Sequence, residues 1–260
     1  MLRPRITPCL LVHKGGLVKT IGFKAPKYVG DPLNAVKIFN EKEADELVLL
    51  DIDATVNNAE PDYRMIANLA AECRMPLCYG GGIKTPAQAK QIIRLGVEKV
   101  AISSAAIEYP ELITQITDEI GRQSVVVVLD VKKRLLSYDY DVFTKNARTN
   151  TKRSVFDLAA EAEKLGAGEL VINSIDLDGA MTGYDLALAE KIRQTVNIPI
   201  TILGGAGTLA DIQALIRTCG VIGASAGSLF VFKGVYRAVL INYPNIVERD
   251  RLINECLSGA

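Results

Sequence analysis

The stretch Thr201-Ile-Leu-Gly-Gly-Ala-Gly207 has the pattern of a short buried strand that runs into a glycine turn. Thr208 follows and opens the segment LADIQALIR, whose apolar residues have helical spacing. Glycines let an oxyanion approach the main chain, and the free N–H groups at the start of a helix point towards it. The stretch therefore predicts a strand, a phosphate-binding turn and a helix in succession.

A second stretch of the same kind lies in the first half of the chain. Pro76-Leu-Cys-Tyr-Gly-Gly-Gly-Ile83 precedes Thr85 and the periodic segment PAQAKQIIRLG, and its Gly80 lies 124 residues before Gly204 in a chain of 260 residues. Three further pairs repeat in the same order at separations of 119 to 125 residues, namely 50–53 with 175–178, 101–104 with 223–228, and 10–14 with 129–133. These repeats predict an internal duplication of four strand–helix units.

Continuous apolar runs predict parallel strands that are covered by helices. The runs are 5–12, 46–52, 76–79, 98–103, 124–131, 168–175, 199–203 and 221–225. Thr85-Pro86 and Gly96 mark the ends of one intervening helix, and Pro110 and Gly121 those of another. Alternating units of this number fit a closed (β/α)8 TIM barrel or an open doubly wound sheet, and the duplication favours the barrel. We expect a single domain over 1–260, with half-barrels of about 1–122 and 123–250.

Composition excludes several classes of protein. Lys plus Arg and Asp plus Glu number 30 each, so the chain has no net charge with which to attract nucleic acid or an anionic membrane. The five cysteines include no C-x-x-C pair, which argues against a disulfide framework and against a zinc site. The N-terminal apolar run is too short for a secretion signal, and no run approaches the roughly 18 residues of a membrane span. We expect a soluble, cytoplasmic protein with no metal and no cofactor.

Polar and glycine residues follow the predicted strands at their C-terminal ends, which is the active face of a barrel of this type. The carboxylates at these ends are Asp51, Asp53, Asp130, Asp176 and Asp178. The glycines and serines are 80–82, 103–104, 204–207 and 227–228. The two phosphate-type turns fall on opposite rims. A ligand with a phosphate at each end would therefore span the mouth of the barrel.

Several of these segments resemble a known family. The runs DELVLLDID, GGGI, VEKVAISSAAIEYPELI, QSVVVVLDVK, GAGELVINSIDLDGAMTGYD and LGGAG are similar to the cyclase subunit of imidazole glycerol phosphate synthase, over almost the whole chain. In that family the barrel forms a heterodimer with a glutaminase, a class I amidotransferase that docks at the N-terminal face. The barrel takes the ammonia that the glutaminase makes and adds it to a bisphosphorylated ribulosyl substrate. The resemblance implies a lyase-type synthase subunit that makes imidazole glycerol phosphate and aminoimidazole carboxamide ribotide in histidine biosynthesis.

The resemblance also implies a role for each residue that matches a family motif. One phosphate is held by Gly82, Ser103 and Ser104, and the other by Gly179, Gly205, Gly227 and Ser228. Ammonia passes a charged ring at the bottom of the barrel, formed by Arg5, Glu46, Lys99 and Glu169. The catalytic residues are Asp178, which matches one of the two family carboxylates that do acid–base work, with Lys19 and Asp130.

The other family carboxylate is missing at the end of the first strand. The family has a run of the type C-L-D-V there, and this chain has Cys9-Leu10-Leu11-Val12. The duplication shows the same change, since Leu11 occupies the place that Asp130 holds in the second half. Leu203, for a usual serine, and Ala180, for a usual threonine, change the same pocket. General acid–base catalysis is worth about 10²–10⁴-fold, so we expect little or no cyclase activity.

Alternative functions stay open. Paralogues with this profile lie beside surface-polysaccharide genes, and the ending GASAGSLFVFKG resembles that branch. The resemblance then implies that the barrel and its glutaminase supply ammonia to a third protein, a sugar amidotransferase that converts an acetamido sugar to an acetamidino sugar. The first alternative is a genuine cyclase of histidine biosynthesis. Another is an isomerase-like barrel that works alone, against which the charged ring argues.

Structural roles compete with functional ones at single residues. Asp51, Asp130 and Asp176 fit loop caps as well as acids, and the glycine turns fit ordinary tight turns. Glu46 and Lys99 fit an ordinary ion pair under the barrel. His13, the only histidine, is expected in an exposed loop, and Cys9 in the packed core.

Overall fold

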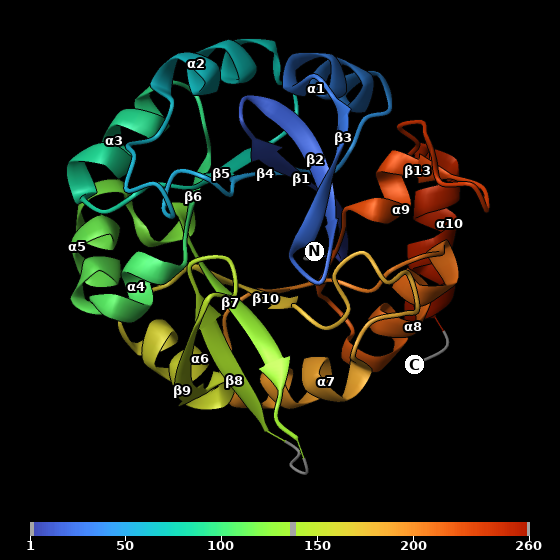
Figure 1. Cartoon of the computed structure of the whole chain (residues 1–260). Coiled ribbons are helices and arrows are strands. Elements are labelled where there is room, and N and C mark those ends of the chain that lie inside the picture. The colour runs from blue at the N-terminus through green and yellow to red at the C-terminus, as the bar shows by residue number, and fades with distance from the viewer. Residues whose placement is uncertain (1–2, 136–138, 259–260) are drawn as a thin grey trace.

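The computed structural model describes residues 3–135 and 139–258, which form a closed barrel of parallel strands inside a ring of helices (Figure 1). The barrel strands are β1 (Arg5–His13), β4 (Leu47–Asp51), β5 (Leu77–Gly80), β6 (Lys99–Ile102), β7 (Val125–Lys133), β10 (Glu169–Ser174), β11 (Ile200–Leu203) and β12 (Gly223–Ala226). Each pairs with the next, β7 pairs with β10, and β12 pairs with β1, which closes the barrel. The predicted (β/α)8 barrel is confirmed. Its strands match the predicted ranges to within two residues at each end.

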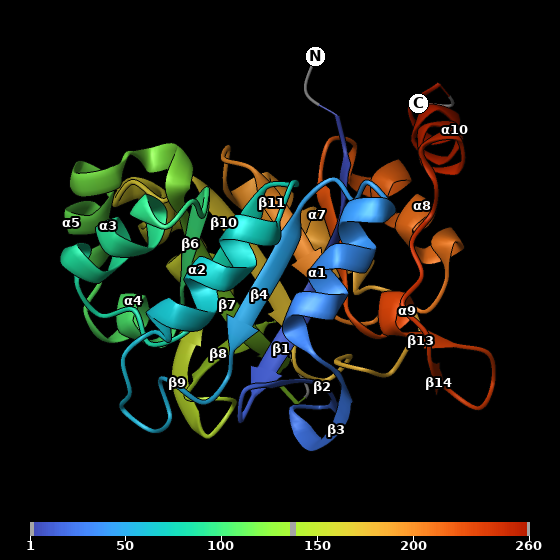
Figure 2. The same ribbon diagram turned by 90° about the horizontal axis from the view of Figure 1, so that it is seen from above.

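Helices cover the outside of the barrel in both views (Figures 1 and 2). They are α1 (Pro32–Glu41), α2 (Tyr63–Glu72), α3 (Pro86–Arg94), α4 (Ser104–Glu108), α5 (Glu111–Ile120), α6 (Val155–Lys164), α7 (Leu186–Thr195), α8 (Leu209–Cys219), α9 (Ser228–Val231) and α10 (Ile246–Leu257), with a short 3-10 turn, η1 (Arg122–Ser124). The predicted helix caps are present. Thr85 and Thr208 cap α3 and α8 through reciprocal side-chain and backbone hydrogen bonds, and Pro110 and Gly121 flank α5.

Three hairpins were not predicted from the sequence. β1 turns back into β2 (Gly16–Ile21) and β3 (Lys24–Gly30), and β7 turns back into β8 (Tyr140–Thr144) and β9 (Thr149–Ser154). A small third hairpin joins β13 (Phe232–Lys233) to β14 (Ala238–Val239). The first two hairpins extend equivalent strands of the two halves, so the duplication includes them. Figure 2 places both at the end of the barrel opposite to the two chain termini.

The core has two layers because strand residues alternate between the two faces of the barrel wall. On β1, Ile6 and Leu10 belong to the larger layer between strands and helices, whereas Cys9 belongs to the small layer inside the barrel. The inner layer is Cys9, Val48, Cys78, Ala101, Val126, Val128, Val171 and Leu203. Small residues predominate there because eight strands enclose little space.

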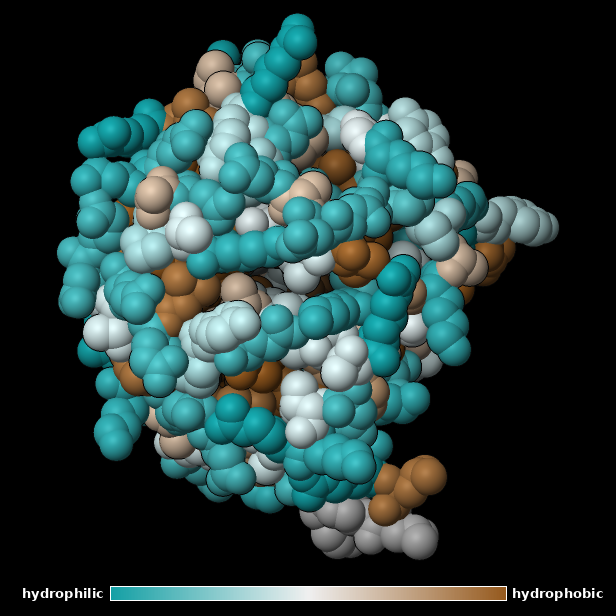
Figure 3. Space-filling model, turned by 60° about the vertical axis from the view of Figure 1, so that its left-hand side comes forward, coloured by the Kyte–Doolittle hydropathy of each residue, from teal (hydrophilic) through white to brown (hydrophobic). Residues whose placement is uncertain are grey.

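The outer surface shows no broad apolar area on the side that brings α3 and α5 forward. Figure 3 shows this face as mainly hydrophilic, with apolar side chains in small separate groups. None of the helices in the described ranges is long and apolar enough to cross a membrane.

Candidate functional site

The C-terminal ends of the strands surround one cavity of about 1230 Å³, its open mouth included. All residues predicted as catalytic or phosphate-binding line it, namely Lys19, Gly82, Ser103, Ser104, Asp130, Asp178, Gly179, Gly205, Gly227 and Ser228. In the described part of the chain, no group of three or more His, Cys, Asp or Glu side chains could hold a metal ion. Carboxylates and a lysine of this lining can transfer protons, and backbone N–H groups can bind anions.

One rim of the cavity contains the turn after β5 and the start of α4. Gly81 and Gly82 have φ angles of 126° and 74°, and a Cβ on Gly81 would lie 2.5 Å from the carbonyl oxygen of Asp51, so only glycine fits. The hydroxyl of Ser103 is buried and has no hydrogen-bond partner among residues 3–135 and 139–258. Ser104 Oγ accepts a hydrogen bond of 3.0 Å from Lys145 N. An unpaired hydroxyl of this kind can donate a hydrogen bond to an anion.

The opposite rim combines Gly205, Gly227 and the start of α9. Gly205 has a φ of 108°, and a Cβ there would lie 2.1 Å from Gly183 O. Gly227 has an ordinary φ, but a Cβ on it would lie 1.9 Å from Lys19 Nζ. Glycine at 227 therefore leaves space for an ammonium group from β2. Lys19 and Gly227 form one rim although 208 residues separate them.

Lys19 is buried, with 6% of its surface exposed. Its Nζ donates a 3.0 Å hydrogen bond to Cys9 O on β1. Burial lowers the pKa of the ammonium, although Cys9 and Asp178 oppose that shift. A lysine with a lowered pKa can exchange protons more readily than an exposed one.

Asp178 fastens the turn between β2 and β3. Its Oδ2 accepts hydrogen bonds from Thr20 Oγ1 (2.6 Å) and from Phe23 N (3.0 Å), and its carbonyl accepts one from Gly22 N (3.0 Å). The carboxylate thus ties a segment of the first half of the chain to the loop after β10. These bonds give Asp178 a positioning role, beside the acid–base role that the family motif implies.

Asp130 is the carboxyl best suited to proton transfer. Burial raises its pKa to about 7, a hydrogen bond of 2.8 Å from Asn173 Nδ2 works against that shift, and the charge of Asp178 adds to it. Both protonation states are therefore populated near neutral pH, which is where a general acid or base is most effective.

Leu11 lines the cavity at the position that is equivalent to Asp130. Leu11 pairs with Val18 on the antiparallel neighbour of β1 and with Leu50 on its parallel neighbour. Asp130 pairs in the same way with Phe143 and Asn173. The cavity therefore has a carboxyl on one side and a leucine on the other, and Leu203 on β11 is a further apolar residue of its lining.

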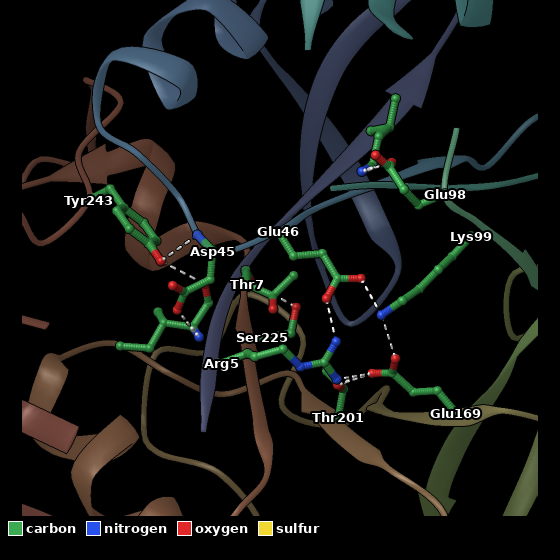
Figure 4. Close-up of polar contacts among 12 residues, drawn as sticks. Arg5, Thr7, Asp45, Glu46, Glu98, Lys99, Glu169, Thr201, Ser225 and Tyr243 are labelled. Atoms are coloured by element: carbon green, nitrogen blue, oxygen red, sulfur yellow. Dashed lines mark hydrogen bonds and ion pairs between the residues drawn. The ribbon is translucent and has the colours of Figure 1, made fainter. Parts of the chain in front are cut away.

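The charged ring closes the bottom of the barrel (Figure 4). Arg5 binds Glu46 at 2.5 Å and Glu169 at 2.6 Å, and Lys99 Nζ binds the same two carboxylates at 2.8 Å each. Burial disfavours both cations, but the carboxylates of Glu169 and Glu46 outweigh it and raise the pKa values of Arg5 and Lys99. Burial also opposes ionisation of Glu169, and Lys99 and Arg5 nevertheless lower its pKa. Arg5, Lys99 and Glu169 are thus held in their charged forms.

Other residues from the sequence analysis have structural contacts. His13 was expected in an exposed loop, and this was wrong: it ends β1, is half-buried, and its Nδ1 lies 2.8 Å from Asp53 Oδ1. Asp51 Oδ1 accepts hydrogen bonds from the backbone of Asp53 and Ala54, as a loop cap does. Asp176 is exposed and accepts a bond from Lys133 N.

Four polar cavity residues that lie on the hairpins or beside Asp130 were missed by the sequence analysis. They are Thr20, Lys145, Asn146 and Asn173. Asn173 sits beside Asp130 in the register of β7 with β10, so two aligned strands could have revealed it. The others lie on the hairpins, whose strands lack continuous apolar runs and gave no signal.

Comparison with known proteins identifies the relatives of this chain. A family model described as "Histidine biosynthesis protein" matches residues 5–237. A protein of Vibrio vulnificus, provisionally named imidazole glycerol phosphate synthase subunit hisF3, is 56% identical over 97% of this chain and 97% of its own. A protein of Pseudomonas aeruginosa, provisionally named subunit hisF2, is 52% identical over 96% and 99%. Subunit HisF of Lactococcus lactis subsp. lactis is 42% identical over 88% and 89%.

Proposed function

We propose that this chain, which belongs to the histidine biosynthesis protein family, receives ammonia from a glutaminase partner and passes it on for sugar amidination. Its barrel is like the HisF cyclase subunit of imidazole glycerol phosphate synthase. The amidated sugar belongs to lipopolysaccharide or another surface polysaccharide, and a sugar amidotransferase is the third protein. Subunits of this family work with a glutaminase in a heterodimer, which supports the first half of the proposal.

Leu11 is the observation that carries the second half. It occupies the cavity position equivalent to Asp130, so the site has lost a group that could take or give a proton. The charged ring, in contrast, is complete and fully paired. A barrel that keeps the ammonia inlet and lacks an acid suits a conduit better than a cyclase.

Sequence similarity supports the same assignment. Identity is 56% and 52% to the relatives with the numbered names hisF3 and hisF2, and 42% to the Lactococcus HisF. The numbered names fit additional copies beside a histidine-pathway enzyme. We therefore assign this chain to that group.

The test is an assay with the purified chain, its glutaminase and a sugar amidotransferase from the same genome. We expect glutamine-driven conversion of the acetamido sugar only when all three proteins are present. Ammonium chloride should replace glutamine and the glutaminase. Full conversion without the barrel would contradict the proposal.

A genuine cyclase is the second candidate, and the cavity gives it specific support. Lys19, Asp130 and both rims that suit a phosphate are present, so a bisphosphorylated ligand fits the mouth. Growth of a histidine auxotroph that lacks its own cyclase, when supplied with this chain and its glutaminase, would favour this function. Failure of the same strain to grow would support the amidination role.

A further inference from the structure

The hairpin of β13 and β14 presents large apolar side chains to solvent. Val235 and Tyr236 lie in its turn and expose 92% and 94% of their surface. Val239 and Leu240 follow the turn, and about half of their surface is exposed. Large apolar side chains that gather in this way mark an interaction surface, whereas scattered ones do not. The hairpin is therefore a candidate site for a partner.

The base of the hairpin is fastened to the barrel. Leu240 N donates a 2.9 Å hydrogen bond to Val231 O, and Asn242 N donates one of the same length to Phe230 O. The ring of Phe230 packs against that of Tyr243, with the ring centroids 5.2 Å apart. Because these contacts fix the base, the turn presents its side chains in a defined arrangement. A partner then loses less conformational entropy in binding them.

The hairpin stands at the cavity end of the barrel. β13 directly follows α9, and α9 begins at Ser228, which lines the cavity. Figure 2 shows the hairpin at the same end of the barrel as β2 and β3, opposite to the two chain termini. Lys27 Nζ on β3 lies 5.2 Å from the ring centroid of Phe232 on β13, so the two hairpins are in contact. A protein bound to the β13–β14 turn would therefore lie beside the mouth of the cavity.

Basic side chains border the apolar turn. Lys233 and Arg237 flank Val235 and Tyr236, and Lys27 lies over the adjoining strand. The segments 16–30 and 232–245 contain neither Asp nor Glu, although the whole chain has no net charge. Interfaces bring together potentials of opposite sign, so the complementary surface is apolar and acidic. Tyrosine and arginine are also the residue types that contribute most to binding at protein interfaces.

The second strand of the hairpin lies outside the part of the chain that the family model describes. That model matches residues only as far as 237, within the turn. The match to the Vibrio vulnificus relative spans 253 of the 260 residues and so includes this strand. The complete hairpin thus belongs to what the chain shares with a relative of a numbered name, which suits a partner that the general family does not need.

We propose that the β13–β14 hairpin docks the sugar amidotransferase that consumes the ammonia, through an apolar and acidic surface of that enzyme. This inference rests on the proposed function, because only that function requires ammonia to leave the cavity for a third protein. Ammonia released into water is protonated and diluted, and ammonium is no nucleophile. A protein docked beside the mouth of the cavity avoids both losses.

The first experiment measures binding of the amidotransferase to the complex of this chain with its glutaminase, by isothermal titration calorimetry. We expect Tyr236→Ala to weaken binding at least about tenfold, as truncation of a central interface tyrosine does. Wild-type affinity should also fall as salt rises, since salt screens exposed charges. Tyr109→Ala is the matched control and should bind like the wild type, because this exposed tyrosine lies between α4 and α5, across the ring of helices from β13 (Figure 1).

Amidated product formed from glutamine separates the docking surface from the proposed function. We expect Tyr236→Ala to raise, at least about tenfold, the concentration of barrel complex that gives the half-maximal rate, while glutamine hydrolysis stays unchanged. If the wild type yields product and Tyr236→Ala binds and works equally well, the docking surface is overturned and the proposed function stands. If the wild-type complex neither binds the amidotransferase nor yields product, the proposed function fails as well.

Two other occupants are tested with the purified chain alone. Sedimentation with vesicles of phosphatidylglycerol and phosphatidylcholine detects binding to an anionic membrane, and analytical ultracentrifugation detects a dimer. We expect neither. Vesicle binding or a dimer that Tyr236→Ala abolishes would overturn the proposal in favour of that occupant. The double variant Lys233→Glu/Arg237→Glu should weaken binding of the amidotransferase at least about tenfold, and unchanged binding would overturn the acidic character of the partner surface.

Discussion

A single residue, Leu11, separates the cavity of this barrel from one with two opposed carboxyls. Replacing it by aspartate would restore the second acid in a cavity that Asp130 and Lys19 also line. The loss of a general acid or base costs about 10²–10⁴-fold. We therefore expect Leu11→Asp to raise cyclase turnover on the histidine-pathway intermediate, with ammonium salt, by at least about tenfold over the wild type.

Leu11→Asn is the matched control, because asparagine has the shape of aspartate and cannot transfer a proton. It should stay at the wild-type rate. A wild type that already turns over at roughly 1 s⁻¹ or faster would show that Leu11 is compensated elsewhere, and the histidine-pathway function would then take first place.

Asp130 gives a pH prediction at the same scale. Its folded pKa of about 7 lies above the usual 3.8, because burial disfavours the charged form. Between these values the folded state binds more protons than the unfolded state, so the contribution of Asp130 to stability falls as pH rises from about 4 to about 7. Asp130→Asn removes this penalty. We expect the variant and the wild type to differ little near pH 4, and the variant to be more stable above pH 7.

The size of that gain has an upper limit. The shift of Asp130 corresponds to at most about 4 kcal/mol at 1.36 kcal/mol per pKa unit, and contact of the carboxyl with the open cavity reduces it. Chemical unfolding of both proteins from pH 4 to pH 8 measures the difference. Asp176→Asn, at an exposed carboxyl, is the control. A difference for Asp130→Asn that does not change with pH would contradict the prediction.

Among the elements, the hairpin of β2 and β3 depends on its bonds to Asp178. Thr20→Val keeps the shape of the side chain and removes the 2.6 Å bond from the hydroxyl to that carboxylate. A hydrogen bond to a charged group is worth about 1.5–3 kcal/mol. We expect amide exchange of residues 19–23 to accelerate roughly 10–100-fold, measured by hydrogen–deuterium exchange. Thr195→Val, on the exposed side of α7, should leave it unchanged.

The elements also show how much of this structure can be predicted from the sequence. The barrel strands and the glycine turns were predictable, because apolar runs and glycines act locally and the duplication fixed their order. The hairpins were not, since KAPKYVG on β3 carries neither an apolar run nor a clean alternation. His13 was misplaced for the same reason, as the turn that extends β1 was not recognised. The bond from Asn173 to Asp130 depends on register, which a single sequence does not reveal.

On the scale of the whole molecule, the ring and the cavity occupy opposite ends of the same strands. Arg5 and Leu11 are six residues apart on β1, which is roughly 20 Å at about 3.3 Å per residue. Among the described residues, no hydrogen bond or ion pair joins a side chain of the charged ring to a side chain that lines the cavity. Energetic effects of substitutions at such distances are additive within about 0.5 kcal/mol.

Lys99→Met and Leu11→Asp test whether the two ends also act separately in function. Lys99→Met leaves Glu46 and Glu169 with Arg5 as their remaining cation. Breaking a fully buried ion pair lowers the free energy of unfolding by about 3–5 kcal/mol, and because Lys99 is partly exposed we expect a smaller decrease of about 1–3 kcal/mol. It should lower the glutamine-driven transfer rate and spare the ammonium-driven rate. Leu11→Asp should spare glutaminase binding.

The double variant should show the sum of both stability changes in chemical unfolding. A coupling above about 1 kcal/mol would mean that the strands transmit strain between the charged ring and the cavity, and the two ends would then act as one site.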